Sequence, residues 1–264
     1  MYTLGFIGCG NMARAIIKGA LASGFAAPEQ IIASSRSQET LDRAMETFGI
    51  HTNLDNCHIA QESQILVLAV KPQVLPEVLD CIKDYMNPDA LVVSLAAGKS
   101  LDFVMEGLGT SRVVRFMPNV AAEVSASMTS VCFGPGCLGQ DFETALALAN
   151  SFGLSEVISE RHMDAATAVA GCSPAYVAML VEAMADAGVL DGMPRSQALR
   201  MAAQAVMGTA KVILETGDHP GAVKDRVCSP GGTTIAGLQV LEDRSFRGAV
   251  IDALHATVDK ARSL

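Results

Sequence analysis

The sequence has few basic residues, and this excludes one large class of partners. Its 264 residues include 19 lysines and arginines against 28 aspartates and glutamates, so the formal net charge is −9. No cluster of basic side chains is present that could follow a phosphate backbone. We therefore expect no nucleic acid among the partners of this protein.

Long hydrophobic runs are also lacking. Glycine, proline or charged residues interrupt each apolar stretch before it reaches the roughly 20 residues that a membrane-spanning helix needs. We attribute the positive mean hydropathy of +0.33 to a buried, alanine-rich helical interior. The first residues lack the basic, apolar and small-residue zones of a signal peptide. These observations predict a cytoplasmic protein without a membrane partner.

Patterns typical of metal sites and disulfide frameworks are absent as well. The seven cysteines are an odd number and include no C-x-x-C pair, and the five histidines show no H-E-x-x-H spacing. Scattered cysteines of this kind are typical of reduced thiols that pack as small apolar side chains. We expect neither disulfides nor a metal.

The first part of the chain alternates short β-branched runs with helical patterns, which is typical of βα units and a parallel sheet. Strands are expected over residues 4–7, 30–33, 65–70, 91–95, 113–117 and 128–133. Helices are expected between them over residues 12–23, 40–48, 74–85 and 101–108.

The strand pattern ends near residue 158, and helical patterns follow over residues 163–190, 196–215, 234–241 and 246–261. The fold class is therefore α/β: an N-terminal Rossmann-type doubly wound sheet (1–158), followed by an all-helical C-terminal domain (159–264). The helix over 163–190 is apolar on nearly every face and must be covered on most sides. Because so small a domain offers little cover, we expect a homodimer and a dimerisation role for these helices.

The segment Gly8-Cys9-Gly10-Asn11-Met12-Ala13 has the pattern G-x-G-x-x-A between the first strand and the first helix. Gly8 permits a tight turn, Gly10 lets the backbone approach a pyrophosphate, and Ala13 allows close packing of helix and strand. The helix N-terminus then favours the phosphates. Although such a turn can be a simple link, its position at the first βα junction predicts binding of a nicotinamide dinucleotide.

The second strand ends in Ser34-Ser35-Arg36 rather than in the acidic residue that accepts a hydrogen bond from the ribose of NAD. Hydroxyls and a guanidinium suit a 2′-phosphate through charge-assisted hydrogen bonds. The pattern favours NADPH, with NADH also possible. The alternative is a polar turn with a solvated arginine.

Several further motifs resemble those of one enzyme family, the pyrroline-5-carboxylate reductases. The resemblance covers essentially the full length, and the segment with Ser-Pro-Gly-Gly-x-Thr is its most specific part. The motifs are Ala69-Val70-Lys71-Pro72, Ala96-Ala97-Gly98, Phe116-Met117-Pro118-Asn119, Pro174-Ala175-Tyr176 and Val227-Cys228-Ser229-Pro230-Gly231-Gly232-Thr233-Thr234.

The resemblance implies NAD(P)H-dependent reduction of 1-pyrroline-5-carboxylate to L-proline, the last step of proline biosynthesis, by an interlocked dimer or a ring of dimers. It implies that cofactor contacts beyond the glycine loop come from Ser34, Asn56, Ala69, Val70, Lys71, Pro72, Leu95, Ala96 and Ala97. It implies that Glu160, Ser229, Gly231, Gly232, Thr233 and Thr234 surround the substrate. Glu160 could instead be a charge near a helix N-terminus.

The chemistry of the loop over residues 229–234 agrees with this role. Backbone N–H groups at the start of a helix can hold the substrate carboxylate. The Thr234 hydroxyl can orient the ring nitrogen while hydride reaches C5 of the imine, so we predict Thr234 as the catalytic residue, acting by positioning and electrostatic stabilisation. The alternative is an ordinary turn between two helices.

Two segments depart from the family pattern. Asn119-Val120-Ala121 stands where the family usually has Asn-Thr-Pro, and Gly171-Cys172-Ser173-Pro174 stands where it has Gly-Ser-Gly-Pro. A hydroxyacid dehydrogenase is disfavoured because no lysine occurs between Arg161 and Ala210. A reductase of another cyclic imine and a cofactor-binding protein without turnover remain alternatives.

Overall fold

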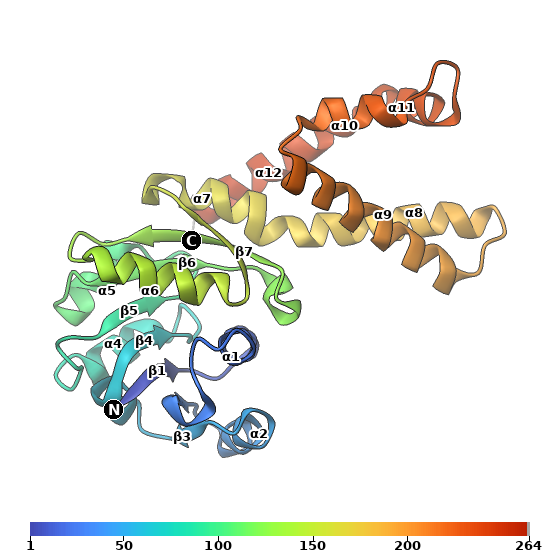
Figure 1. The fold of residues 1–264 in the computed structure, drawn as a ribbon. Coiled ribbons are helices and arrows are strands. Elements are labelled where there is room, and N and C mark those ends of the chain that lie inside the picture. The colour runs from blue at the N-terminus through green and yellow to red at the C-terminus, as the bar shows by residue number, and fades with distance from the viewer. Residues whose placement is uncertain (263–264) are drawn as a thin grey trace. The chain divides into compact units, whose positions relative to one another are not determined.

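The computed structural model describes residues 1–262, which form two compact units that we describe separately. The first unit holds residues 1–172 and the end of helix α12 from Val258, and the second runs from Ser173 to Thr257. The first unit is built on one eight-stranded sheet and the second is helical (Figure 1). The expected α/β fold with a helical C-terminal part is confirmed.

The sheet has the strand order β3-β2-β1-β4-β5-β6-β7-β8. All neighbouring strands are parallel except β6 and β7, which are antiparallel. Because the order runs outward in both directions from β1, the sheet is doubly wound, as expected. The strands are β1 (Tyr2–Ile7), β2 (Ile31–Ser34), β3 (His51–Asn53), β4 (Ser63–Leu68), β5 (Leu91–Ser94), β6 (Val113–Met117), β7 (Ser127–Phe133) and β8 (Gly153–Val157).

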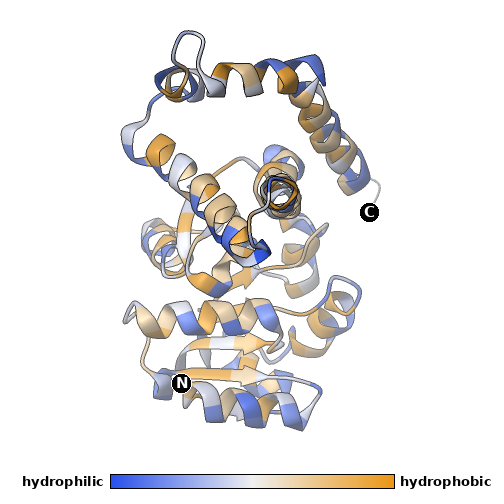
Figure 2. Cartoon of the chain, turned by 90° about the vertical axis from the view of Figure 1, so that its right-hand side faces the viewer, coloured by the Kyte–Doolittle hydropathy of each residue, from blue (hydrophilic) through white to orange (hydrophobic). Residues whose placement is uncertain are grey.

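Helices cover both faces of this sheet, so its central strands are apolar on both sides (Figure 2). The helices of the first unit are α1 (Asn11–Ala22), α2 (Gln38–Phe48), α3 (Asn56–Glu62), α4 (Leu75–Ile82), α5 (Leu101–Leu108), α6 (Gly139–Asn150) and α7 (Met163–Ala166). Phe6 packs in one core with residues of α1 and α6, whereas Ile7 packs in the other with residues of α4 and α5. Successive side chains of β1 thus serve opposite cores.

Local sequence signals fix where the covering helices begin and end. The Ser37 hydroxyl accepts a hydrogen bond from the Thr40 amide at the start of α2, and the Ser100 hydroxyl accepts one from Phe103 at the start of α5. Both helices end at a glycine with positive φ. These short connections return the chain to the sheet, so the turns after parallel strands gather at one edge.

The second unit consists of α8 (Ser173–Leu190), α9 (Arg195–Thr216), α10 (Pro220–Val227), α11 (Thr233–Asp243) and α12 (Phe246–Arg262). Within α8 only Ala185 is buried, although the helix is strongly apolar. Of the described helices, the run Glu160–Leu190 is long and apolar enough to cross a membrane by length and composition alone. The expectation that every apolar stretch is too short was wrong on that criterion.

The expected single helix over residues 163–190 is interrupted. A π-helical segment, Thr167–Cys172, separates α7 from α8. Pro174 lacks the N–H that would donate to the carbonyl of Ala170 in a regular helix. The Asn119 side chain instead donates to that carbonyl through Nδ2 at 2.9 Å. This hydrogen bond joins the first segment that departs from the family pattern, at Asn119, to Ala170, the residue that directly precedes the second segment.

Candidate functional site

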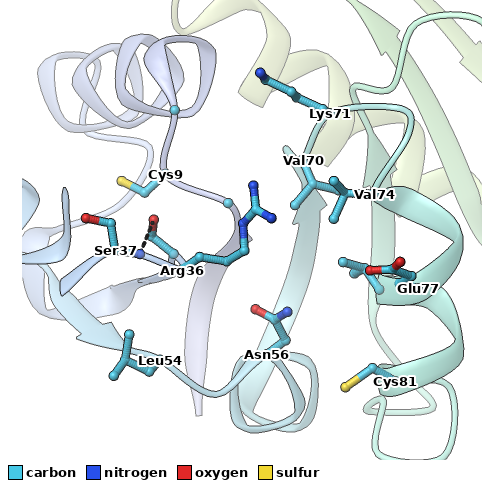
Figure 3. A pocket seen from close by; sticks show the side chains of 14 residues that line it. Cys9, Arg36, Ser37, Leu54, Asn56, Val70, Lys71, Val74, Glu77 and Cys81 are labelled. Carbon is cyan, nitrogen blue, oxygen red and sulfur yellow. Dashed lines mark hydrogen bonds between the residues drawn. The ribbon is translucent and has the colours of Figure 1, made fainter.

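The turns that follow β1, β2 and β4 line a cavity of about 560 Å³ at the carboxyl edge of the sheet (Figure 3). Helix α4 forms the opposite wall. The cavity brings together eight of the residues expected to hold a cofactor: Gly8, Cys9, Gly10, Ser35, Arg36, Asn56, Val70 and Lys71. Ligands of doubly wound sheets bind at this edge, where the strand order reverses.

The two glycines of the first turn have different tasks. Gly8 has φ +97°, and a Cβ there would lie 2.8 Å from the carbonyl oxygen of Ala69. Gly10 precedes α1 with φ −78° and ψ −173°, and a Cβ there would meet nothing within 4 Å. Gly8 is therefore required by the turn itself, whereas Gly10 leaves open space in front of the α1 N-terminus. That space and the free amides fit a phosphate group.

Arg36 extends into the cavity from the end of β2 toward Val70 and Val74 (Figure 3). Across residues 1–262 no carboxylate forms an ion pair with its guanidinium. Ser35 lines the same wall, and its hydroxyl accepts a hydrogen bond from the Ser37 amide. The end of the second strand lies beside the adenosine ribose in a dinucleotide site, so the Arg36 guanidinium is suited to bind a phosphate on the 2′-oxygen of that ribose.

Ser34 acts on the cavity through Asn56. Its side chain is fully buried, and its hydroxyl donates to Asn56 Oδ1 at 2.7 Å. With Oδ1 engaged, the Asn56 Nδ2 group is left as the donor on the cavity wall. The nearby carboxylate of Asp55 accepts from the Cys57 amide at 2.9 Å and fixes the start of α3.

The remaining expected cofactor residues lie outside the described wall of this cavity. Ala69 and Leu95 continue β4 and β5, because their amides donate to the carbonyls of Ile7 and Leu68 at 2.9 and 3.1 Å. The residues concerned are Asn11, Met12, Ser34, Ala69, Pro72, Leu95, Ala96 and Ala97. Their contacts with a cofactor stay predictions.

Sequence reasoning missed the wall that α4 provides. It comprises Val74, Glu77, Val78 and Cys81, and it is joined by Leu54 and Ser37. The helix was expected, but its pattern of apolar residues gave no means to distinguish the residues that face the cavity. Leu54 follows the short strand β3, which was not expected.

The loop over residues 229–234 joins α10 to α11 in the second unit. Gly231 has φ +68°, and the Gly232 amide donates to the Ser229 carbonyl at 3.0 Å, which closes the turn. A Cβ on Gly232 would lie 2.3 Å from Ser229 Oγ. Thr233 and Thr234 form the exposed first turn of α11, where backbone amides lack acceptors within the helix. Exposed amides and hydroxyls in one turn can bind an anion.

Glu160 belongs to the first unit and already has partners there. Its Oε1 accepts from the Leu101 amide at 2.7 Å and from the Arg115 guanidinium at 3.1 Å. The Arg115 side chain is nearly buried, so this carboxylate supplies the opposite charge that a buried cation needs. Glu160 thus accepts from the first amide of α5 and balances the charge of Arg115, and its contact with substrate stays a prediction.

Known families match both parts of the chain. Residues 160–264 match the family described as pyrroline-5-carboxylate reductase dimerisation, and residues 3–98 match NADP oxidoreductase coenzyme F420-dependent. A pyrroline-5-carboxylate reductase of Escherichia coli is 48% identical over 99% of this chain and 97% of its own length.

Solved structures agree. A pyrroline-5-carboxylate reductase from Coxiella burnetii has a TM-score of 0.93 at 34% identity, covering 99% of this chain and 98% of its own. A Plasmodium falciparum pyrroline carboxylate reductase with NADP bound has a TM-score of 0.88 at 29% identity, covering 99% and 97%. The similarity therefore spans both units of this chain.

Proposed function

The chain belongs to the pyrroline-5-carboxylate reductase family, and from that membership we propose how its own residues divide the reaction. It reduces 1-pyrroline-5-carboxylate to L-proline with a nicotinamide dinucleotide. We assign NADPH to the cavity at the edge of the sheet and the substrate carboxylate to the loop over residues 229–234. The working form is a homodimer or a ring of dimers in the cytoplasm.

The position of Arg36 is the observation that carries the choice of NADPH. Its guanidinium shares one cavity with Gly8 and Gly10, so a dinucleotide with its pyrophosphate at the glycine turn brings its adenosine ribose toward Arg36. NADPH differs from NADH only by the 2′-phosphate, and a bidentate guanidinium contact recognises that group. The NADP bound to the Plasmodium relative supports the same choice.

Substitution of Arg36 tests this assignment. We expect Arg36→Ala to raise the Kd of NADPH at least about tenfold, because one lost charge-assisted hydrogen bond is the lower bound for a bidentate contact, and to leave the Kd of NADH within about twofold. Fluorescence titration of each nucleotide measures both constants. Arg43→Ala is the matched control, because Arg43 is an exposed arginine of α2 that pairs with Glu39. Equal losses for the two nucleotides would refute the 2′-phosphate contact.

The residues of the loop supply positioning rather than a strong acid. The amides at the start of α11 hold the carboxylate, and the Thr234 hydroxyl orients the ring nitrogen. The bound dinucleotide supplies a hydride to C5 of the imine. Because the nitrogen arrives protonated from solvent, the hydride completes the secondary amine without a further proton donor. The exposed first turn of α11 fits this task, since it leaves these groups accessible.

Substitution of Thr234 tests the role of the loop. Thr234→Val keeps the branched shape but removes one hydrogen bond to a charged group, worth about 1.5–3 kcal/mol. We expect kcat/KM to fall about 10- to 150-fold while NADPH affinity stays unchanged. If the bond strengthens in the transition state, part of the loss appears in kcat. Thr144→Val on α6 is the control, and unchanged kcat/KM in Thr234→Val would place the substrate elsewhere.

A further inference from the structure

Two cysteines lie against each other beside the dinucleotide cavity. Cys57 is in the first turn of α3 and Cys81 in the last turn of α4, and their Sγ atoms are 3.4 Å apart. Cys57 Sγ also lies 3.3 Å from the carbonyl oxygen of Cys81. Both thiols are free. They form a reduced pair at contact distance, although 24 residues separate them in the sequence.

The geometry of this pair is close to that of a disulfide. A bonded S–S distance is about 2.05 Å, so the two sulfur atoms need to approach by roughly 1.4 Å. Helices α3 and α4 already pack together within the first unit. Rotation of the two side chains with a small helix shift can supply this approach. None of the other five cysteines is recorded in contact with a second thiol among the described residues.

The two cysteines lie at the wall of the dinucleotide cavity. Cys81 is exposed and lines the cavity wall together with Arg36 and Asn56, and Cys57 follows Asn56 directly in α3. Figure 3 shows Cys81 and Asn56 on facing walls of the cavity, below Arg36. The end of β2 marks the adenosine side of a dinucleotide site. If the adenosine of a dinucleotide occupies this side of the cavity, it covers Cys81.

We propose that Cys57 and Cys81 are a modification site, at which a small disulfide such as oxidised glutathione converts the pair into an intramolecular disulfide. Bound dinucleotide opposes this reaction because it covers Cys81. The opposition by dinucleotide rests on the proposed function of the cavity, whereas formation of the disulfide does not.

The reaction proceeds by two thiol–disulfide exchanges. The exposed Cys81 attacks as a thiolate, breaks the small disulfide and expels one small thiolate. Cys57 then loses its proton to solvent, attacks Cys81 Sγ in the mixed disulfide and expels the second small thiolate. The protein loses two electrons and two protons, and the small disulfide is reduced to two thiols. In the reduced pair, burial and next the contact with Cys81 raise the pKa of Cys57 to about 11, which disfavours Cys57 as the first attacking thiolate.

Mass spectrometry of one tryptic peptide tests the proposal. Trypsin does not cleave the Lys71–Pro72 bond, so Cys57 and Cys81 fall in a single peptide, residues 44–83, that contains no other cysteine. After incubation of the full chain with oxidised glutathione, we expect this peptide to lose two hydrogen atoms and to regain them on treatment with a reducing thiol. Cys57→Ser and Cys81→Ser should each abolish this loss, whereas Cys172→Ser should preserve it.

The same reaction in the presence of NADPH tests the coupling. At about ten times its Kd, NADPH leaves roughly one eleventh of the protein free, so the loss of hydrogen should slow about tenfold. Fluorescence in the same samples measures the occupancy. If the rate of hydrogen loss stayed unchanged at verified NADPH occupancy, the proposed opposition by bound dinucleotide would be wrong. If the peptide kept both hydrogens, Cys57 and Cys81 would not form the proposed disulfide. Absence of NADPH binding would instead overturn the proposed cofactor site, so the failures are distinct.

Discussion

Single residues at the glycine turn show how the fold and the binding site place different demands on the same amino acid. Gly8 has a backbone conformation that other residues rarely adopt, and it lies against the carbonyl of Ala69. Gly10 has an extended backbone that any residue can adopt, with open space where a side chain would lie. The need for glycine at position 10 therefore comes from the ligand.

This difference predicts opposite outcomes for two similar substitutions. We expect Gly10→Val to fold normally, with a melting temperature within a few degrees of wild type, and to lose at least about 100-fold in NADPH affinity. The valine would fill the space that the pyrophosphate needs, in front of the α1 N-terminus. Thermal denaturation and fluorescence titration measure the two properties.

Gly8→Val provides the contrast. It forces a β-branched residue to positive φ and a Cβ contact of 2.8 Å, so we expect it to destabilise the fold by several kcal/mol. If Gly10→Val retained NADPH affinity, the phosphates would not lie at this turn.

At the scale of elements, one ion pair ties α6 to the start of β6. Arg112 donates through Nε to Asp141 Oδ2 at 2.9 Å and through Nη2 to Oδ1 at 2.5 Å. Asp141 is almost fully buried and also accepts from the Leu138 amide at 2.8 Å. The hydrogen bonds from Arg112 lower the pKa of Asp141 below its usual value. The ionised carboxylate therefore stabilises the folded state.

This pair predicts a pH-dependent contribution to stability. A carboxyl group whose pKa is lowered on folding stabilises the protein above its unfolded pKa of about 3.9, and the stabilisation is lost as pH falls through the lower folded pKa. We expect Asp141→Asn to reduce the free energy of unfolding by about 1.5–3 kcal/mol at neutral pH. The difference from wild type should shrink as pH falls below about 4. Urea denaturation across that range measures it.

Glu39→Gln is the matched control for this prediction. It breaks an ion pair of similar length with Arg43, but both of these side chains are more than half exposed. We expect its effect to stay below about 1 kcal/mol at every pH, because solvent screens exposed pairs. If the two substitutions lowered the free energy of unfolding equally, burial of Asp141 would not strengthen its ion pair.

Elements with strong local signals could be predicted from the sequence, and weakly marked ones could not. Helix α5 was expected over residues 101–108 and found there, because Ser100 and Gly109 mark its ends. Helices α3, α6 and α10 and strands β3 and β8 were not expected. β3 has only three residues, and β8 lies at the edge of the sheet, where β7 is its single neighbouring strand. Neither strand therefore shows a clear alternation of apolar and polar residues.

The candidate site divides in the same way. The glycine turn and Arg36 could be found because their motifs are contiguous in the sequence. The hydrogen bond between Ser34 and Asn56 and the contact between Cys57 and Cys81 join residues 22 and 24 positions apart across separate elements. Such pairings depend on how the strand and the helices pack, which no local pattern encodes.

At the scale of the whole molecule, the second unit exposes more apolar surface than a stable monomer should. On α8, Val177, Met179 and Met184 are 42%, 69% and 42% exposed, and on α9 Met201 and Leu214 are 63% and 67% exposed. Extended apolar surfaces of this kind mark interfaces between proteins. Residues 160–264 match a dimerisation family, so a second copy of this chain is the expected cover.

A charge on this apolar surface tests that expectation. Met179→Lys places an ammonium group on α8, and a symmetric dimer contains the substitution twice. Burying an unpaired charge costs about 3 kcal/mol per copy, so the cost of about 6 kcal/mol corresponds to a rise of roughly 10⁴-fold in the dimer dissociation constant. Light scattering at micromolar concentration should then give the mass of one chain for Met179→Lys and at least two for wild type.

The control introduces the same charge on exposed apolar surface in the first unit. Leu138 is 72% exposed at the start of α6, and Leu138→Lys should keep the mass of wild type, because no copy of the chain is expected to cover it. Circular dichroism must show that both variants retain their helices. If Met179→Lys kept the full mass while folded, α8 would lie outside the interface, and its apolar face would need another cover. If both variants became monomeric, the interface would extend to the first unit, and the helical unit alone would not account for assembly.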